Sequence, residues 1–492
     1  MKSFVSFFLI ISVLYTLSFV SPVALAQEVL DDTFTSDTST ESVTSAYDAV
    51  LKAMLIISQV ALIGLIFNHL ILQRTLRNNK KAQENSVVQF VSTSFYHTSG
   101  KLVVFLLICC ISIIVFSTGI MLLSSYELAQ NLELDLSPAF WIIYSTPVGD
   151  VWVLRIVTSF IIIAILISYH IKIRKKINKK NRLNQGKDLD PNQIAHSYGK
   201  LDRILLFSIL VLGSFNLYSN SMISHSNSLD SFSSLAVSVD WIHFMSVSIW
   251  IGGLFYLTVL FVKRHSKPAD GNNNIDSNVV PPSSEKRVLE QMTQGLMYFS
   301  FIAVTAISII GITGLYLAFV HLQNLSSLFT SVYGLILVIK LSLAFPMIFI
   351  GRYNQVKIYD YAKLISTSNA NIKRNSAAYQ DSELKSNSGI FLRKINKSLK
   401  IESMLGILVL VAASFLTVTS PPSLESMDQN LNQSTLNVHS SNDIFASNLT
   451  LLYVVIFLSI IISIFGIINF RKNQKQIYEV AFHSTTQRAK GG

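Results

Sequence analysis

Long apolar runs separated by polar segments dominate the pattern of this chain. Nine of them are long enough, or nearly so, to cross the roughly 30 Å hydrocarbon core of a bilayer as helices. These runs are 47–72, 102–123, 151–171, 201–218, 237–262, 296–320, 332–350, 404–419 and 449–470. The pattern therefore predicts an all-α fold, a polytopic transmembrane helix bundle of about nine spans.

A further apolar run, 4–20, follows Met1 and Lys2 and precedes the small-residue stretch 24–26. This order is typical of a cleavable secretory signal peptide, so we expect residues 1–26 to be removed. A retained first helix is the alternative interpretation.

The polar segments between the runs divide the rest of the chain. The predicted parts are an acidic extracytoplasmic segment (27–46), a five-span N-terminal helix group (47–262), a cytoplasmic linker (263–295), a three-span group (296–420) with a cytoplasmic loop (352–402), an outer loop (421–448), a last span (449–470) and a cytoplasmic tail (471–492). The linker and the loop are rich in Ser, Asn and Lys, which favours flexible connectors without a folded domain.

Composition agrees with a membrane protein, since 50% of the residues are hydrophobic and 14% are charged. Apart from Lys2, Lys52, Lys101, Arg155 and Lys340, every Lys and Arg falls in segments on one side of the predicted spans. The positive-inside rule makes that side cytoplasmic, with the mature N-terminus outside and the C-terminus inside the plasma membrane. The net charge of +11 thus reflects topology and contact with the lipid bilayer, and no nucleic-acid partner is predicted.

Several kinds of chemistry are missing from the sequence. The two cysteines, Cys109 and Cys110, are adjacent within an apolar run, so there is no disulfide framework and no CxxC site. We expect them to pack as small hydrophobic residues rather than to relay copper(I). Walker A, HExxH and GxSxG motifs are also absent, and the chain is predicted not to be an enzyme.

Ionisable residues near the outer end of the fifth run are the first candidates for function. Asp240 and His243 lie one helical turn apart, and such groups are expensive inside a membrane unless they have a task or a partner. The preceding run ends in a short loop that brings Met222 and His225 to the same region. Imidazole and thioether groups suit copper, so His225, His243 and Met222 are the predicted metal ligands. A histidine hydrogen-bonded to a neighbouring helix is the alternative for His243.

Other residues are expected to support this site. His321, at the outer end of the sixth run, is a further candidate ligand, whereas Met245 points about 200° away from His243 on an ideal helix and is expected to pack. Asp240 could accept the second imidazole N–H, capture an incoming ion or neutralise a nearby cation. Trp250, Gly252 and Gly253 would let helices approach one another closely.

Two segments of the chain echo each other. Arg155 follows Gly149 by six residues and Lys340 follows Gly334 by six, each near the start of a run that crosses in the same direction. This suggests a parallel repeat of the kind found in transporters, although chance is an alternative. Either the two cations snorkel to headgroups, or they face the bundle and pair with Asp150, Asp240 or another acid.

Together these motifs resemble the CopD (copper resistance D) family over most of the chain beyond residue 47. The matching residues are Asp240, His243, Trp250, Gly252 and Gly253; Phe299, Ser300, Ala303, Thr313 and Gly314; Tyr333, Gly334 and Lys340; and Glu402, Gly406, Val409, Leu410, Pro421 and Pro422. The chain departs from the family pattern at Ser224, where the family has Gly, and at Asp150, which is commonly basic.

The resemblance implies a copper-handling protein that binds the copper ion at the outer face and imports it or supports copper tolerance. It also implies a separate CopC-like extracytoplasmic partner. A non-transporting factor that delivers copper to a membrane copper enzyme is the main alternative, followed by a haem-binding electron-transfer bundle. The sequence leaves the oxidation state of the copper and the direction of its movement open.

Overall fold

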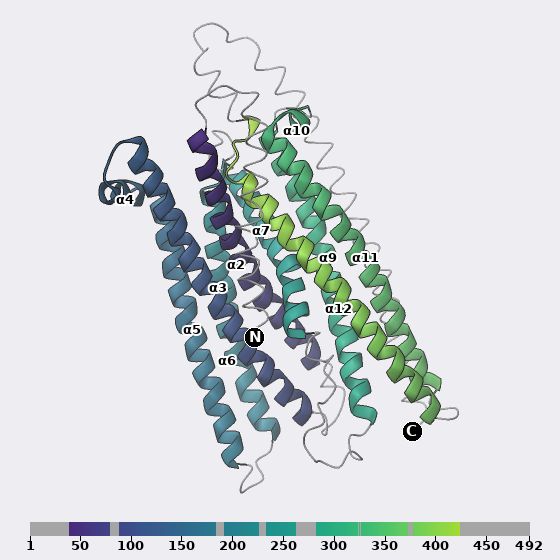
Figure 1. Cartoon of the computed structure of the whole chain (residues 1–492). Helices are drawn as coiled ribbons and strands as arrows, with labels where there is room; N and C mark the ends of the chain where they lie inside the picture. The colour runs from purple at the N-terminus through teal and green to yellow at the C-terminus, as the bar shows by residue number, and fades with distance from the viewer. Residues whose placement is uncertain are drawn as a thin grey trace. The chain divides into compact units, whose positions relative to one another are not determined.

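The structure is a computed structural model that describes residues 39–78, 88–183, 191–225, 233–261, 282–322, 324, 326–371 and 377–423. These residues form helices (Figure 1). The elements are α2 (Ser39–Asn78), α3 (Val88–Asn131), α4 (Leu136–Tyr144), α5 (Pro147–Leu183), α6 (Pro191–Met222), α7 (Ser233–Tyr256), the π-helical η3 (Leu257–Phe261), α9 (Pro282–His321), α10 (Ser327–Thr330), α11 (Val332–Asn371) and α12 (Ala377–Leu416).

Eight of these helices are long and apolar enough to span a membrane. The membrane-spanning segments are Ala46–Leu72, Gly100–Asn131, Pro147–Lys172, Arg203–Met222, Ser233–Leu260, Thr293–His321, Val332–Ala362 and Arg393–Leu416. The predicted all-α polytopic fold is therefore confirmed for the first eight runs. The ninth run (449–470) and the predicted signal peptide (1–26) lie outside the described residues.

The chain divides into two compact units, Met1–Asp48 and Ala49–Gly492, and the helix bundle belongs to the second. Consecutive long helices of this unit run in opposite directions, as the alternating sides of their connections require (Figure 1). At one end, α6 and α9 finish, α7 and α11 begin, and the short helix α10 lies between α9 and α11. We call this the α10 end; the predicted topology makes it the outer end.

The structure differs from the sequence-based expectation at residues 352–402. Helix α11 continues to Asn371 and α12 begins at Ala377, so most of this predicted loop is helical. The segment is polar but contains no proline, and therefore nothing in it stops a helix from extending beyond the membrane. The other predicted domain boundaries stay predictions.

Helices α2 and α7 cross with their backbones in contact. A Cβ atom on Gly252 would clash with the backbone of α2 at Gly64, and one on Gly64 would clash with α7 in the same way. At the next position, a Cβ on Gly253 would lie 2.6 Å from the side-chain nitrogen of Asn68. Asn68 in turn donates to the carbonyl of Ile249 at 3.1 Å. At this crossing the two glycines leave room for the close approach of α2 and α7.

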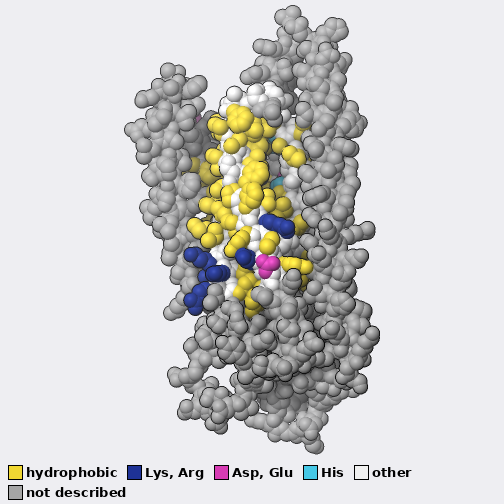
Figure 2. Space-filling model, turned by 90° about the vertical axis from the view of Figure 1, so that its right-hand side faces the viewer, with side chains coloured by type: hydrophobic (Ala, Val, Ile, Leu, Met, Phe, Trp, Pro, Cys, Tyr) yellow, Lys and Arg dark blue, Asp and Glu magenta, His cyan; other side chains and the backbone are white. Residues whose placement is uncertain are grey.

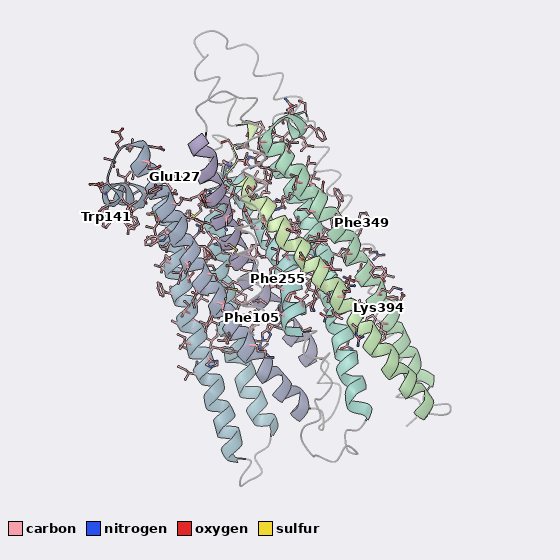
Figure 3. All side chains as sticks on the ribbon, viewed as in Figure 1. Phe105, Glu127, Trp141, Phe255, Phe349 and Lys394 are labelled. Atoms are coloured by element: carbon pink, nitrogen blue, oxygen red, sulfur yellow. The ribbon has the colours of Figure 1, made fainter. Side chains whose placement is uncertain are left out.

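Large apolar side chains cover the outer faces of the bundle, as expected for helices in contact with lipid. Phe349 on α11 is 71% exposed and projects away from its neighbours (Figure 3). On the side where α11 and α12 lie, hydrophobic side chains form a long band, and Lys and Arg side chains gather toward its lower part (Figure 2). Trp141 on α4, 64% exposed, belongs to an aromatic cluster typical of a membrane interface.

Candidate functional site

Two histidine rings lie close together, edge to face, at the α10 end of the bundle. His225 lies in the turn that follows α6, and His321 is the last residue of α9. Their ring centroids are 6.4 Å apart, and the rings are inclined at 78°. His321 is buried, and the Nε2 atom of His225 is buried without a hydrogen-bond partner in the described part of the chain. The structure thus joins a predicted ligand to the histidine that the sequence analysis held as a further candidate.

The separation of the two rings suits a shared metal ion. A metal lies about 2 Å from an imidazole nitrogen, and the ring centre lies about 1 Å behind that nitrogen. Two rings on opposite sides of one ion would therefore have centroids about 6 Å apart, close to the observed 6.4 Å.

Asp240, on α7, lies near this histidine pair. It is 8% exposed, and its Oδ2 atom accepts no hydrogen bond from the described residues. The hydroxyls of Ser221, in the last turn of α6, and Ser224, just after α6, lie beside the carboxylate, and Lys340 of α11 acts on it electrostatically. Tyr333 of α11 lies between Asp240 and the histidine pair. It interacts with Asp240, and its ring centroid is 6.1 Å from that of His321.

His243 is buried one turn below Asp240 on α7. Its Nδ1 atom is 2.9 Å from the hydroxyl of Thr313 on α9. The ring packs against Gly314, where a Cβ atom would lie 3.3 Å from the Cε1 atom of His243. Lys340 also acts electrostatically on His243. This contact agrees with the alternative interpretation of His243, a histidine hydrogen-bonded to a neighbouring helix, and the backbone of Ile310 on the same helix also interacts with the ring.

A lysine of α2 lies near the histidine pair, although its position in the sequence did not predict this. Lys52 on α2 lies within electrostatic reach of His225. Burial, followed by this positive charge, lowers the pKa of His225 below its ordinary value, and the backbone of Thr419 opposes the shift. His225 is therefore neutral at physiological pH, which is the form that binds metals. In the sequence, Lys52 stands out only as one of the few Lys and Arg residues outside the predicted cytoplasmic segments.

Arg155 occupies a different polar network, between α5 and α6. It is 3% exposed, and its guanidinium donates to the hydroxyl of Ser219 and to the side-chain oxygen of Asn220, both at 2.7 Å. Arg155 therefore faces the bundle, but its hydrogen-bond partners are neutral rather than the predicted acids. Asp150 is exposed.

The same network reaches α2 through two amide side chains. Asn216 donates to the carbonyl of Arg155 at 3.2 Å and to Thr158 at 2.8 Å. Gln59 donates to the side chain of Asn216 at 2.8 Å and accepts from Asn220 at 2.7 Å. These contacts join α2, α5 and α6, so Arg155 is a structural cation in this arrangement.

The remaining predicted residues are placed as follows. Met222, at the end of α6, is 38% exposed, and Met245 is partly buried on α7. Trp250 is buried further along α7, where its indole lies beside the carboxyl group of Glu402. Within the described residues, no group of three or more His, Cys, Asp or Glu side chains has the geometry of a metal site.

The two segments that echo each other in sequence share a local construction. A short helix precedes each long one: α4 precedes α5, and α10 precedes α11. A Cβ atom on Gly149 would clash with the carbonyl of Tyr144, and one on Gly334 would clash with the carbonyl of Ser327. Each glycine thus lets the first turn of the long helix rest directly against the short one.

The fold and this site define a polytopic helical membrane protein with a buried polar cluster at one end. Residues 294–416 form a domain of the CopD family, described as copper resistance protein D. The domain supplies Thr313, His321, Tyr333 and Lys340 to the cluster, while His225, Asp240 and His243 come from the chain before it. Comparisons with curated proteins and with solved structures gave no match.

Proposed function

We propose that this CopD family membrane protein binds copper at the α10 end, between His225 and His321, and passes it across the membrane toward the cytoplasm. The observation that carries the proposal is the histidine pair, whose 6.4 Å separation fits one ion bound by two imidazoles. Copper is the cargo here and not a resident cofactor.

Charge at the site supports binding of a cation at low coordination number. Among the described residues, the buried Nε2 of His225 and the buried Oδ2 of Asp240 have no hydrogen-bond partner, so both atoms could contact an ion. A small number of neutral nitrogen ligands suits Cu(I) better than zinc, which prefers four ligands. The copper-resistance family domain provides half of the site, which agrees with copper as the ligand.

His243 lies on the inward side of this pair. It is one turn further along α7 than Asp240, so an ion that leaves the histidine pair would meet Asp240 and then His243. Lys340 balances the charge of Asp240 while the site is empty, and displacement of this cation by copper would keep the buried charge low.

Purified protein in lipid vesicles tests the proposal. We expect His225→Ala and His321→Ala each to abolish copper uptake while protein abundance in the membrane holds. His170→Ala is the matched control, because His170 lies on α5 near the end of its span farthest from Pro147 and should leave uptake unchanged. Uptake that is unaffected by both site variants contradicts the proposal. Binding without uptake in the wild type favours a delivery role instead.

A further inference from the structure

A second buried polar group lies deeper in the bundle, away from the histidine pair. Glu402 on α12 is 3% exposed. Asn354 on α11 is also 3% exposed and donates from Nδ2 to the Oε2 atom of Glu402 at 3.0 Å. The indole of Trp250, on α7, lies beside the same carboxyl group. Three helices therefore converge on one acid.

Among the described residues, the side chains around Glu402 do not compensate a negative charge. Those that act on it, Asn354 and Trp250, are neutral, and η3, which also packs against α12, carries no titratable side chain. An ionised carboxylate is costly in such a position unless a cation accompanies it.

The charged groups of α11 at this level turn outward instead. Arg352 is exposed and donates to Gln355 at 2.7 Å. Lys357 is exposed and lies over the ring of Tyr353, 5.8 Å from its centroid. Neither cation serves as a counter-ion for Glu402.

The side-chain oxygen of Asn354 indicates the protonation state of Glu402. The Oδ1 atom of Asn354 is buried and has no hydrogen-bond donor in the described part of the chain. A protonated carboxyl group can donate its O–H to an amide oxygen while it accepts from the amide N–H, and this reciprocal pair would satisfy both side chains. An ionised Glu402 would leave Asn354 Oδ1 without a partner, at the cost of an unmade buried hydrogen bond.

We propose that Glu402 is a proton-binding site that exchanges its proton for the cargo cation. In the exchange, the Glu402 O–H bond breaks, the proton leaves to water at the end opposite α10, and one positive charge of the cargo pairs with the carboxylate. No electron is transferred. The exchange rests on the proposed copper function, whereas the protonation of Glu402 does not.

Helix α7 connects this acid with the copper-binding end. His243 and Trp250 are seven residues apart, which places them on the same face of α7 and about 10 Å apart along its axis. A cation that passes His243 would therefore travel along one helix face to reach Glu402.

Infrared difference spectroscopy of the purified protein in lipid, between acidic and alkaline pH, tests the protonation directly. We expect the carboxylic-acid C=O absorption of the wild type to contain one component that is lost in Glu402→Gln. Gln is the matched replacement, because its amide can donate to Asn354 Oδ1 and accept from Asn354 Nδ2. Asp240→Asn is the control and should keep this component. A C=O absorption in Glu402→Gln that is identical to that of the wild type overturns the proposal.

The fluorescence of Trp250 gives a second test if Glu402→Gln does not fold. A protonated carboxyl group beside an indole quenches its emission differently from a carboxylate, so we expect a pH-dependent emission that Trp250→Phe removes. Emission from Trp250 that is independent of pH overturns the proposal.

Vesicles loaded with a pH-sensitive dye test the exchange. We expect copper to drive proton release in the wild type, and this release to be lost in Glu402→Gln while copper binding at His225 and His321 is kept. Copper uptake without proton release overturns the exchange and leaves the copper function standing. If the protein shows the Glu402 infrared band but binds no copper, the proton-binding site is supported and the copper function is overturned.

Discussion

Arg155 and Lys340 have the same local setting but different surroundings. Each lies six residues after a glycine that rests against a short helix, yet Arg155 is held by Ser219 and Asn220, whereas Lys340 faces Asp240. A cation held by neutral groups fixes helices in place, since no mobile charge can replace its partners. A cation opposite an acid can be displaced by another cation. The comparison separates a structural centre from a site for exchange.

The largest expected effect belongs to the structural side of this comparison. Arg155→Ala removes two charge-assisted hydrogen bonds and leaves Ser219 and Asn220 with unmade bonds, so the free energy of unfolding should fall by about 3–5 kcal/mol. Thermal unfolding in detergent measures this loss. Arg155→Lys should recover only part of the stability, because lysine lacks the planar fork. If Arg155→Ala unfolds normally but no longer binds copper, the assignment is wrong.

Lys340 and Asp240 should change copper affinity in opposite directions. Lys340→Met removes a positive charge from the cluster and should tighten copper binding roughly tenfold, as expected for loss of one like charge within about 10 Å. Asp240→Asn should weaken binding roughly tenfold. Competition titration with a copper chelator measures both. Equal shifts in the same direction would show that the two residues do not form an electrostatic pair.

The pH dependence of copper binding should follow His225. Because the pKa of His225 is lowered, the imidazole stays neutral, and copper affinity should be constant from pH 8 down to about 6.5, the ordinary histidine value. Below that range, protons compete for the ring and affinity should fall. Lys52→Met should move this fall to higher pH, since the neighbouring positive charge disfavours the protonated ring. A fall at lower pH in that variant would contradict the electrostatic argument.

The smallest effect is expected at the hydrogen bond between His243 and Thr313. Thr313→Val keeps the shape of the side chain and removes the hydroxyl, so the unfolding free energy should decrease by about 1 kcal/mol. Thr313→Ser should restore the bond. If both variants lose stability equally, the loss comes from packing and not from the hydrogen bond.

Much of the fold was predictable because membrane helices leave a strong pattern in the sequence. The apolar runs gave the eight described spans, and the burial cost of charged groups pointed to Asp240, His243, Arg155 and Lys340 before any contact was known. The sequence pattern did not predict the helical extensions over 352–371 and 377–402, since a polar helix has no hydrophobic period to reveal it.

The partners within the site were harder to predict. His225 lies beside His321, whereas His243 contacts Thr313, because the side chains that meet between helices are set by tertiary packing. Arg155 has neutral partners, because Ser219 and Asn220 on the neighbouring helix lie closer to it than any of the predicted acids. Sequence spacing shows on which face of its own helix a residue lies, but it does not show which residue of a neighbouring helix packs against that face.

The proposed copper site can be tested by copper titration of purified protein with altered histidines. We expect wild-type protein to bind one Cu(I) ion at the α10 end, His225→Ala and His321→Ala each to weaken this binding by at least about a hundredfold, and His170→Ala to leave it unchanged. X-ray absorption of the copper-loaded wild type should show two imidazole nitrogens at about 2 Å. If both site variants bind copper with wild-type affinity, the histidine pair is not the copper site.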